Sequence, residues 1–177
     1  SHVSPVFIDE LLAEGYQLRI HGSATLVDPP FASAIFQRIP HLQISTPGAT
    51  TYDRDRRITT DFIRELPTLK QKAPFFAFLF YDLAHSFEYP KKLPKKFTPS
   101  WDYADYTRLN NDTDPTPFFN LYRNCCWQID QMIGEVIAQL KQEGLYDNTI
   151  IVVSGDHAQE FNENKKNFWG HNGNFSP

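Results

Sequence analysis

Two side chains that commonly bind metal ions stand next to each other where an apolar stretch of the sequence ends. The β-branched run Ile150–Val153 is followed by Ser154-Gly155 and then by Asp156 and His157. A carboxylate beside an imidazole suits Zn²⁺ or Mn²⁺, whereas carboxylates alone would suit harder cations. Once the chain has left the pleat of a strand, both side chains can reach one ion or straddle two. The alternative is that Asp156 caps a turn and His157 is a surface histidine, and the dipeptide alone leaves both interpretations open.

Two further histidines could join this pair. His85 follows the apolar run 75–81 by way of Asp82, and His171 lies 14 residues beyond His157. In open parallel sheets, ligand sites form just outside the carboxyl ends of the strands. We therefore predict one site shared by these segments. The alternative is that His85 is a hydrogen-bonded loop histidine and that Asp82 serves the turn.

Apolar spacing predicts three helices that alternate with three strands. The run 75–81 is apolar throughout, which is typical of a strand buried on both faces of a parallel sheet. Gly15 and Gly144 follow the first and last helices as C-terminal caps. The alternation predicts right-handed crossovers and a mainly parallel sheet, hence an α/β fold. The expected helices cover 6–12, 53–66 and 122–140, and the expected strands cover 16–20, 75–81 and 150–153. His21, after the first strand, has no supporting motif and is interpreted as structural.

The composition describes one globular domain over residues 1–177. The hydrophobic share is 41% and the charged share is 21%, which argues against disorder. A net charge of -4 argues against nucleic acid as a partner, and no apolar run approaches the length that spans a bilayer. The N-terminus does not have the pattern of a signal peptide. The only notable basic patch comprises Lys91, Lys92, Lys95 and Lys96, between prolines, and is interpreted as part of a solvated loop.

Two other segments have a plain interpretation. Residues 86–117 are rich in Pro, Lys, Tyr and Asp without sustained periodicity, which predicts a long loop facing a substrate or a partner. Cys125 and Cys126 are adjacent and cannot readily form a disulfide with each other, so we interpret them as small apolar residues of a buried helix. The sequence has no G-x-S-x-G, P-loop or G-x-G-x-x-G motif.

These motifs together resemble a known family. The segment 147–157, with Glu160 and then 169–171, resembles the alkaline phosphatase superfamily, in its sulfatase and phosphoethanolamine-transferase branch. The pattern 12–16 before a strand is also typical of sulfatases. Within that branch, 154–175 is most similar to the sulfatase-like periplasmic domains of inner-membrane proteins of the YejM type. The resemblance implies a three-layer α/β sandwich with a mainly parallel sheet, incomplete at both ends.

The resemblance also implies roles for particular residues. Asp156 and His157 match a metal-ligand pair, for Zn or Mn, or else Ca or Mg. His171 matches a histidine that binds a second metal or the substrate head group, and His85 matches the histidine near the leaving group. Nothing in the sequence matches the family's nucleophile or its first acidic ligand, so we expect a piece of a larger, membrane-anchored protein that is inactive alone. The resemblance also implies glycine, as most relatives have it, where this chain has Ala158.

Three functions therefore remain open at this point. The first is a metal-dependent hydrolase or transferase acting on sulfate or phosphate esters, including lipid head groups. The second is an inactive periplasmic module that regulates envelope lipid or lipopolysaccharide by binding lipopolysaccharide, cardiolipin or a protein. The third is a stable structural piece without bound metal.

Overall fold

A parallel pair of strands lies at the centre of the structure. The computed structural model describes residues 5–69 and 73–171. Strand β1 (Gln17–Gly22) pairs in parallel with β2 (Phe75–Phe80), in a register that runs from Gln17 opposite Phe75 to Gly22 opposite Phe80. The crossover between them contains the helices α2 (Phe31–Ala34) and α3 (Thr51–Leu69). The predicted parallel arrangement of these two strands is confirmed.

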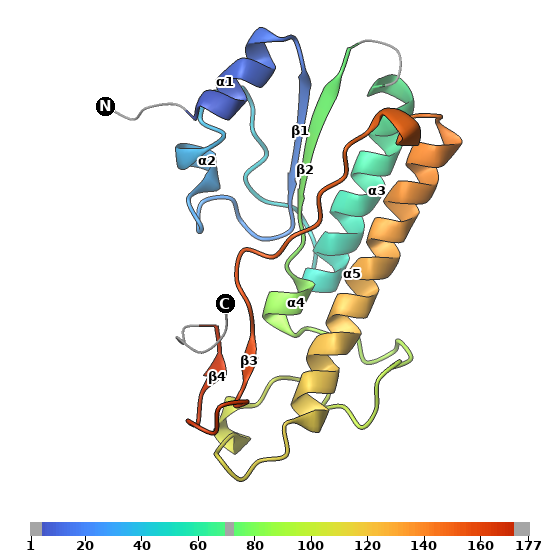
Figure 1. Ribbon diagram of the computed structural model, residues 1–177. Helices are drawn as coiled ribbons and strands as arrows, with labels where there is room; N and C mark the ends of the chain where they lie inside the picture. Colours follow the sequence, from blue (N-terminus) through green and yellow to red (C-terminus); the bar gives the residue numbers. More distant parts are fainter. Residues whose placement is uncertain (1–4, 70–72, 172–177) are drawn as a thin grey trace.

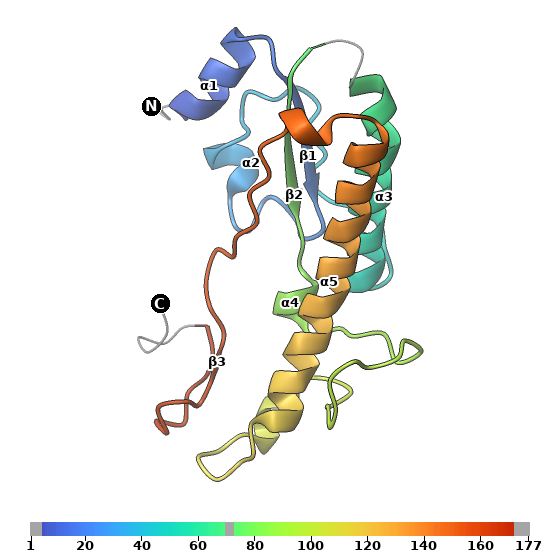
Figure 2. The same ribbon diagram turned by 45° about the vertical axis from the view of Figure 1, so that its right-hand side comes forward.

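Helices cover both faces of this pair, which gives three layers. Helices α1 (Val6–Ala13) and α2 lie on one side, and α3 and the long α5 (Thr116–Gln142) lie on the other (Figures 1 and 2). The six residues of β2 divide between the layers because successive side chains of a strand point to opposite faces. The apolar continuity of 75–80 thus reflects packing on both faces. Phe76, Phe78 and Phe80 pack with α1 and α2, while Phe75, Ala77 and Leu79 pack with α3 and α5.

Local signals in the sequence set the ends of the main helices. Gly15 and Gly144 have φ of 75° and 69°, and each lies at the centre of a Schellman motif after α1 and α5. At the start of α3, the Thr50 amide donates to Asp53 and the Asp53 amide donates to the Thr50 hydroxyl, which is a capping box. Helix α5 begins at Thr116, six residues before the predicted start, because Pro117 is compatible with the first turn of a helix.

The long segment between β2 and α5 is packed against α5. It contains α4 (Leu83–Ser86), the 3-10 helix η1 (Tyr106–Arg108) and an aromatic cluster built on α5. Phe87 stacks on Phe118 at 5.0 Å between ring centroids, and Trp101 stacks on Phe118 at 5.3 Å. Cys125 is buried in the same cluster, burial raises the pKa of its thiol, and both cysteines are free thiols. The interpretation of Cys125 as an apolar residue of a buried helix is confirmed.

The predicted strand at 150–153 is wrong. After η2 (Tyr146–Asn148), residues 150–153 form no strand, and the exposed fractions of Ile150, Ile151, Val152 and Val153 are 93%, 40%, 82% and 67%. An apolar run becomes a strand only when a neighbour accepts its backbone hydrogen bonds. Within 5–69 and 73–171, no strand pairs with this segment, so the main sheet has two strands rather than three.

A short hairpin ends the described chain. Strands β3 (Glu160–Phe161) and β4 (Trp169–Gly170) pair in an antiparallel fashion, with Glu160 opposite Gly170. Phe161 is buried and lies 4.9 Å from the Phe119 ring and 5.4 Å from the Phe118 ring, between centroids. The hairpin is therefore attached to the N-terminal part of α5. The sequence signals did not predict these two strands, because each has only two residues.

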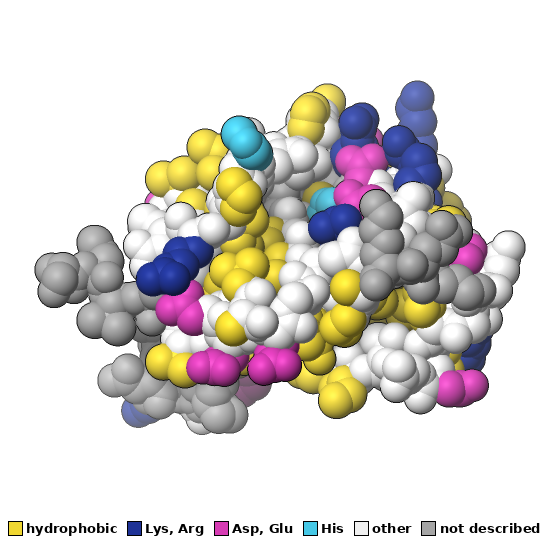
Figure 3. All heavy atoms as spheres, turned by 90° about the horizontal axis from the view of Figure 1, so that it is seen from above, with side chains coloured by type: hydrophobic (Ala, Val, Ile, Leu, Met, Phe, Trp, Pro, Cys, Tyr) yellow, Lys and Arg dark blue, Asp and Glu magenta, His cyan; other side chains and the backbone are white. Residues whose placement is uncertain are grey.

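No helix among the described residues is long and apolar enough to cross a bilayer. The face shown in Figure 3 carries acidic and basic side chains together, with hydrophobic side chains reaching the surface between them.

Candidate metal centre

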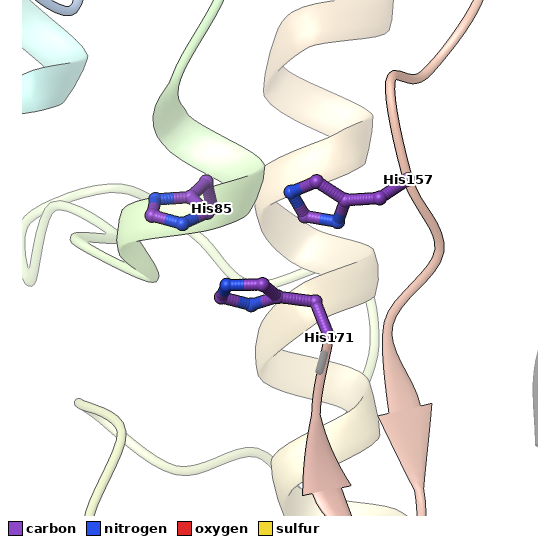
Figure 4. Close-up of side chains that lie close together, drawn as sticks. All are labelled: His85, His157 and His171. Atoms are coloured by element: carbon purple, nitrogen blue, oxygen red, sulfur yellow. The ribbon is translucent and has the colours of Figure 1, made fainter. Parts of the chain in front are cut away.

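Three histidines from three separate segments come together beyond the carboxyl end of β2. His85 lies on α4, His157 follows the extended segment 150–156, and His171 follows β4 (Figure 4). Each offers one ring nitrogen within 4.8 Å of those of the other two, and all three residues are exposed. The ring centroids of His157 and His171 are 4.5 Å apart, and that of His85 is 5.9 and 5.1 Å from them.

The position of His85 follows from the packing of α4. Leu83, two residues before it, is fully buried in the aromatic cluster of α5. The amides of Asp82 and Leu83 each donate to one carboxylate oxygen of Asp55 at 3.0 Å. One Asp82 oxygen lies 3.5 Å from Nδ1 of His85, and the Asp82 carboxylate is itself largely buried. The end of β2 is thus fixed both by apolar packing and by Asp55 on α3.

His157 is oriented by the backbone of the next residue. Its Nδ1 lies 3.0 Å from the carbonyl oxygen of Ala158, which favours the tautomer with the proton on Nδ1. A Cβ at Gly155 would come within 3.3 Å of the His157 carbonyl oxygen, so glycine suits the close approach there. Ala158 is absent from the described residues with positive φ, so the alanine that departs from the resemblance causes no backbone strain.

The β3–β4 hairpin brings His171 to the other two histidines. Gly170, directly before it, has φ of 142°, a conformation that favours glycine. Desolvation lowers the pKa of His171 below its usual value, and the neighbouring His157 and His85 lower it further. The neutral imidazole, which is the form that binds a metal, is therefore favoured at neutral pH.

The donor set fits a borderline divalent ion. Imidazole nitrogens suit Zn²⁺, and a tetrahedral site with Zn–N bonds of about 2.0–2.1 Å has its nitrogens about 3.4 Å apart. Separations of up to 4.8 Å require the exposed rings to rotate closer together. Two carboxylates, Asp82 and Asp156, lie near the histidines and would favour a cation there. Three imidazoles leave one tetrahedral position open, as in catalytic zinc sites.

The structure thus brings together three of the four residues predicted for the site. Asp156 lies beside the group, with a carboxylate oxygen 3.8 Å from Nε2 of His157, but the three-histidine set does not include it. Its metal-ligand role remains a prediction. His21 lies apart from the cluster, with Nε2 3.3 Å from a Glu65 oxygen. The sequence reasoning missed Asp55, although a carboxylate three residues before Ile58, on the apolar face of α3, was a signal of a buried acid.

The fold is of the α/β class, with two layers of helices around a parallel strand pair. The candidate ligand side chains gather beyond the end of a strand, as ligand sites do in open parallel sheets. The family model of the sulfatases matches residues 14–177. The chain therefore belongs to the sulfatase family.

Two curated relatives match parts of this chain. Lipoteichoic acid synthase 1 of Bacillus subtilis is 30% identical over 120 residues, which is 62% of this chain and 17% of the relative. An uncharacterized protein of Haemophilus influenzae is 24% identical over 174 residues, 96% of this chain and 23% of the relative. The chain thus spans less than a quarter of the length of either relative.

Proposed function

We propose that this protein is part of a metal-dependent sulfatase-family hydrolase or transferase acting on sulfate or phosphate esters. The observation that carries the proposal is the convergence of His85, His157 and His171 in a chain of this family. All three side chains are exposed. An exposed site of imidazoles around a bound cation suits the anionic group of a sulfate or phosphate ester.

We assign the metal to His157 with Asp156, and the head group or a second ion to His171 and His85. A bound divalent ion would supply Lewis-acid polarisation of a sulfate or phosphate oxygen. The chain's own part is to hold His157 at the metal, and His171 and His85 at the head group or a second ion. The lowered pKa of His171 keeps that ring neutral, and therefore able to bind, at physiological pH.

The substrate class that we propose is an ester on a lipid head group, in a periplasmic domain of an inner-membrane protein of the YejM type. The similarity to lipoteichoic acid synthase 1 is the support for a lipid-linked ester as the substrate class. The resemblance of residues 154–175 to the YejM type is the support for the location. Binding of such a lipid without turnover is the competing function.

Metal binding is the first test of the proposal. Zn²⁺ and Mn²⁺ titrations followed by calorimetry compare the wild type with His157→Ala, His171→Ala and Asp156→Ala. We expect about one equivalent of metal in the wild type and at least roughly tenfold weaker binding in each variant. His41→Asn is the matched control, because His41 is exposed, lies outside the cluster and has φ of 56°, which asparagine tolerates. Unchanged binding in His157→Ala would contradict the assignment.

Turnover is the second test, and it requires the longest natural form of the protein. Aryl phosphates, aryl sulfates and phospholipids are supplied with saturating metal, and release of the head group is measured. Hydrolysis that disappears in His157→Ala supports the enzyme. Lipid binding that persists without hydrolysis supports the regulatory alternative.

A further inference from the structure

A buried carboxylate lies beneath the turn that carries His85. Asp55 on α3 is fully buried, and its two oxygens accept the amides of Asp82 and Leu83, each at 3.0 Å. These are the N-cap and the first residue of α4. The carboxylate therefore binds the start of a helix, where backbone amides have no partner within the helix. Both of its oxygens are used in this way, so Asp55 fixes the direction as well as the position of α4.

A second carboxylate acts on the histidine itself. The Asp82 side chain makes no capping hydrogen bond to α4, and its Oδ1 lies 3.5 Å from Nδ1 of His85, one helical turn further on. A carboxylate on this side of an imidazole attracts the proton to Nδ1 and leaves the lone pair on Nε2. Free histidine favours the opposite tautomer, with the proton on Nε2, so the preference must come from the surroundings. The Ala158 carbonyl oxygen plays the equivalent part for His157.

We propose that Asp55 and Asp82 are positioning residues for His85. Asp55 fixes the start of α4, and Asp82 selects the tautomer in which Nε2 can bind. This inference rests on the proposed function and takes His85 as a metal ligand, because Nε2 is the atom that would then contact the ion. Figure 4 shows the His85 ring beside the rings of His157 and His171, and the centroids of these two rings are 5.9 and 5.1 Å from that of His85. Two carboxylates on different elements, α3 and the end of β2, thus position His85.

The test is the variant Asp82→Ala, which removes the contact with His85 without removing a helix cap. Nitrogen-15 NMR reads the tautomer of His85, and calorimetry reads Zn²⁺ binding. In the wild type we expect the proton on Nδ1; in Asp82→Ala we expect it on Nε2 and Zn²⁺ binding weaker by about tenfold or more. Thermal unfolding should change little. Asp147→Ala on η2, beyond the far end of α5 from α4 (Figure 1), is the matched control and should leave both readouts unchanged.

The outcomes separate this inference from the proposed function. If the wild type binds no Zn²⁺, the proposed function fails, while the tautomer measurement still decides the role of Asp82. An unchanged tautomer in Asp82→Ala overturns the inference, and so does unchanged affinity in a wild type that binds Zn²⁺. The variant Asp55→Asn tests the role of Asp55, because the asparagine side chain offers one acceptor oxygen in place of two. It should weaken Zn²⁺ binding; wild-type affinity in a folded Asp55→Asn would overturn the role of Asp55.

Discussion

Ala158 follows the Asp156-His157 pair where the resemblance to sulfatases implies glycine. Its φ is not positive, and its carbonyl oxygen faces the His157 ring. Glycine there would gain no relief from strain and would increase the entropy of the unfolded chain. We therefore expect Ala158→Gly to lower the free energy of unfolding by roughly 0.4–1 kcal/mol, measured by urea denaturation. The metal affinity of Ala158→Gly should stay within about twofold of the wild-type value. A clear rise in the stability of this variant would show that the position needs a left-handed backbone.

Single residues also show what sequence reasoning can and cannot find in a site. The sequence pointed to His85, His157 and His171 because each follows an apolar or glycine-containing segment. The hydrogen bonds from Asp82 and Leu83 to Asp55 were not predictable. They join α3 to the end of β2 across 27 and 28 residues, and the partners of a buried acid depend on the tertiary contact.

Helix α5 offers two glycines with opposite expected effects. Gly144 has φ of 69° beyond the C-terminus, so Gly144→Ala forces an alanine into the left-handed region and should cost about 1–2 kcal/mol. Gly134 lies within the helix, and a Cβ there would meet nothing within 4 Å. Gly134→Ala should therefore raise stability by roughly 0.5–1 kcal/mol. Thermal or urea unfolding of the two variants measures both; equal effects of the same sign would contradict the assigned cap.

The extended segment 150–153 has the sequence of a strand and no strand partner among the described residues. Exposed, extended β-branched segments with unpaired backbone groups tend to pair with other chains. We expect the wild type to self-associate through this segment, and Val152→Lys, at a residue 82% exposed, to weaken that association, as measured by sedimentation velocity. Val27→Lys introduces the same charge at another exposed valine and should have no such effect. Equal self-association of all three proteins would show that the segment does not mediate it.

Across the whole molecule, the sequence predicted the elements better than their pairing. The alternation of β2 side chains between two helical layers explains why its apolar run was recognisable, and the same logic failed at 150–153. Both runs are apolar and β-prone, but only the first has helices on its two faces and β1 at its edge. Apolar composition measures the tendency to be buried; burial itself depends on which other segments are present.

The stability of the whole molecule should carry a pH dependence that originates at Asp55. Burial raises the pKa of Asp55 from 3.8 to about 6, against the opposing effect of its hydrogen bonds to the Asp82 and Leu83 amides. A folded-state pKa above the unfolded value means that the native state holds the proton more tightly. Its stabilising contribution is therefore complete below about pH 3.8 and is lost as the pH rises through about 6. The size of the effect is about 3 kcal/mol.

The variant Asp55→Asn isolates this contribution, because asparagine does not titrate. The free energy of unfolding of the wild type minus that of Asp55→Asn should fall by up to about 3 kcal/mol between pH 4 and pH 7. Urea denaturation at several pH values measures both proteins, and groups common to both cancel in the difference. A flat profile for Asp55→Asn would mean that Asp55 titrates near its unfolded value, and that its two amide donors fully offset the cost of burial.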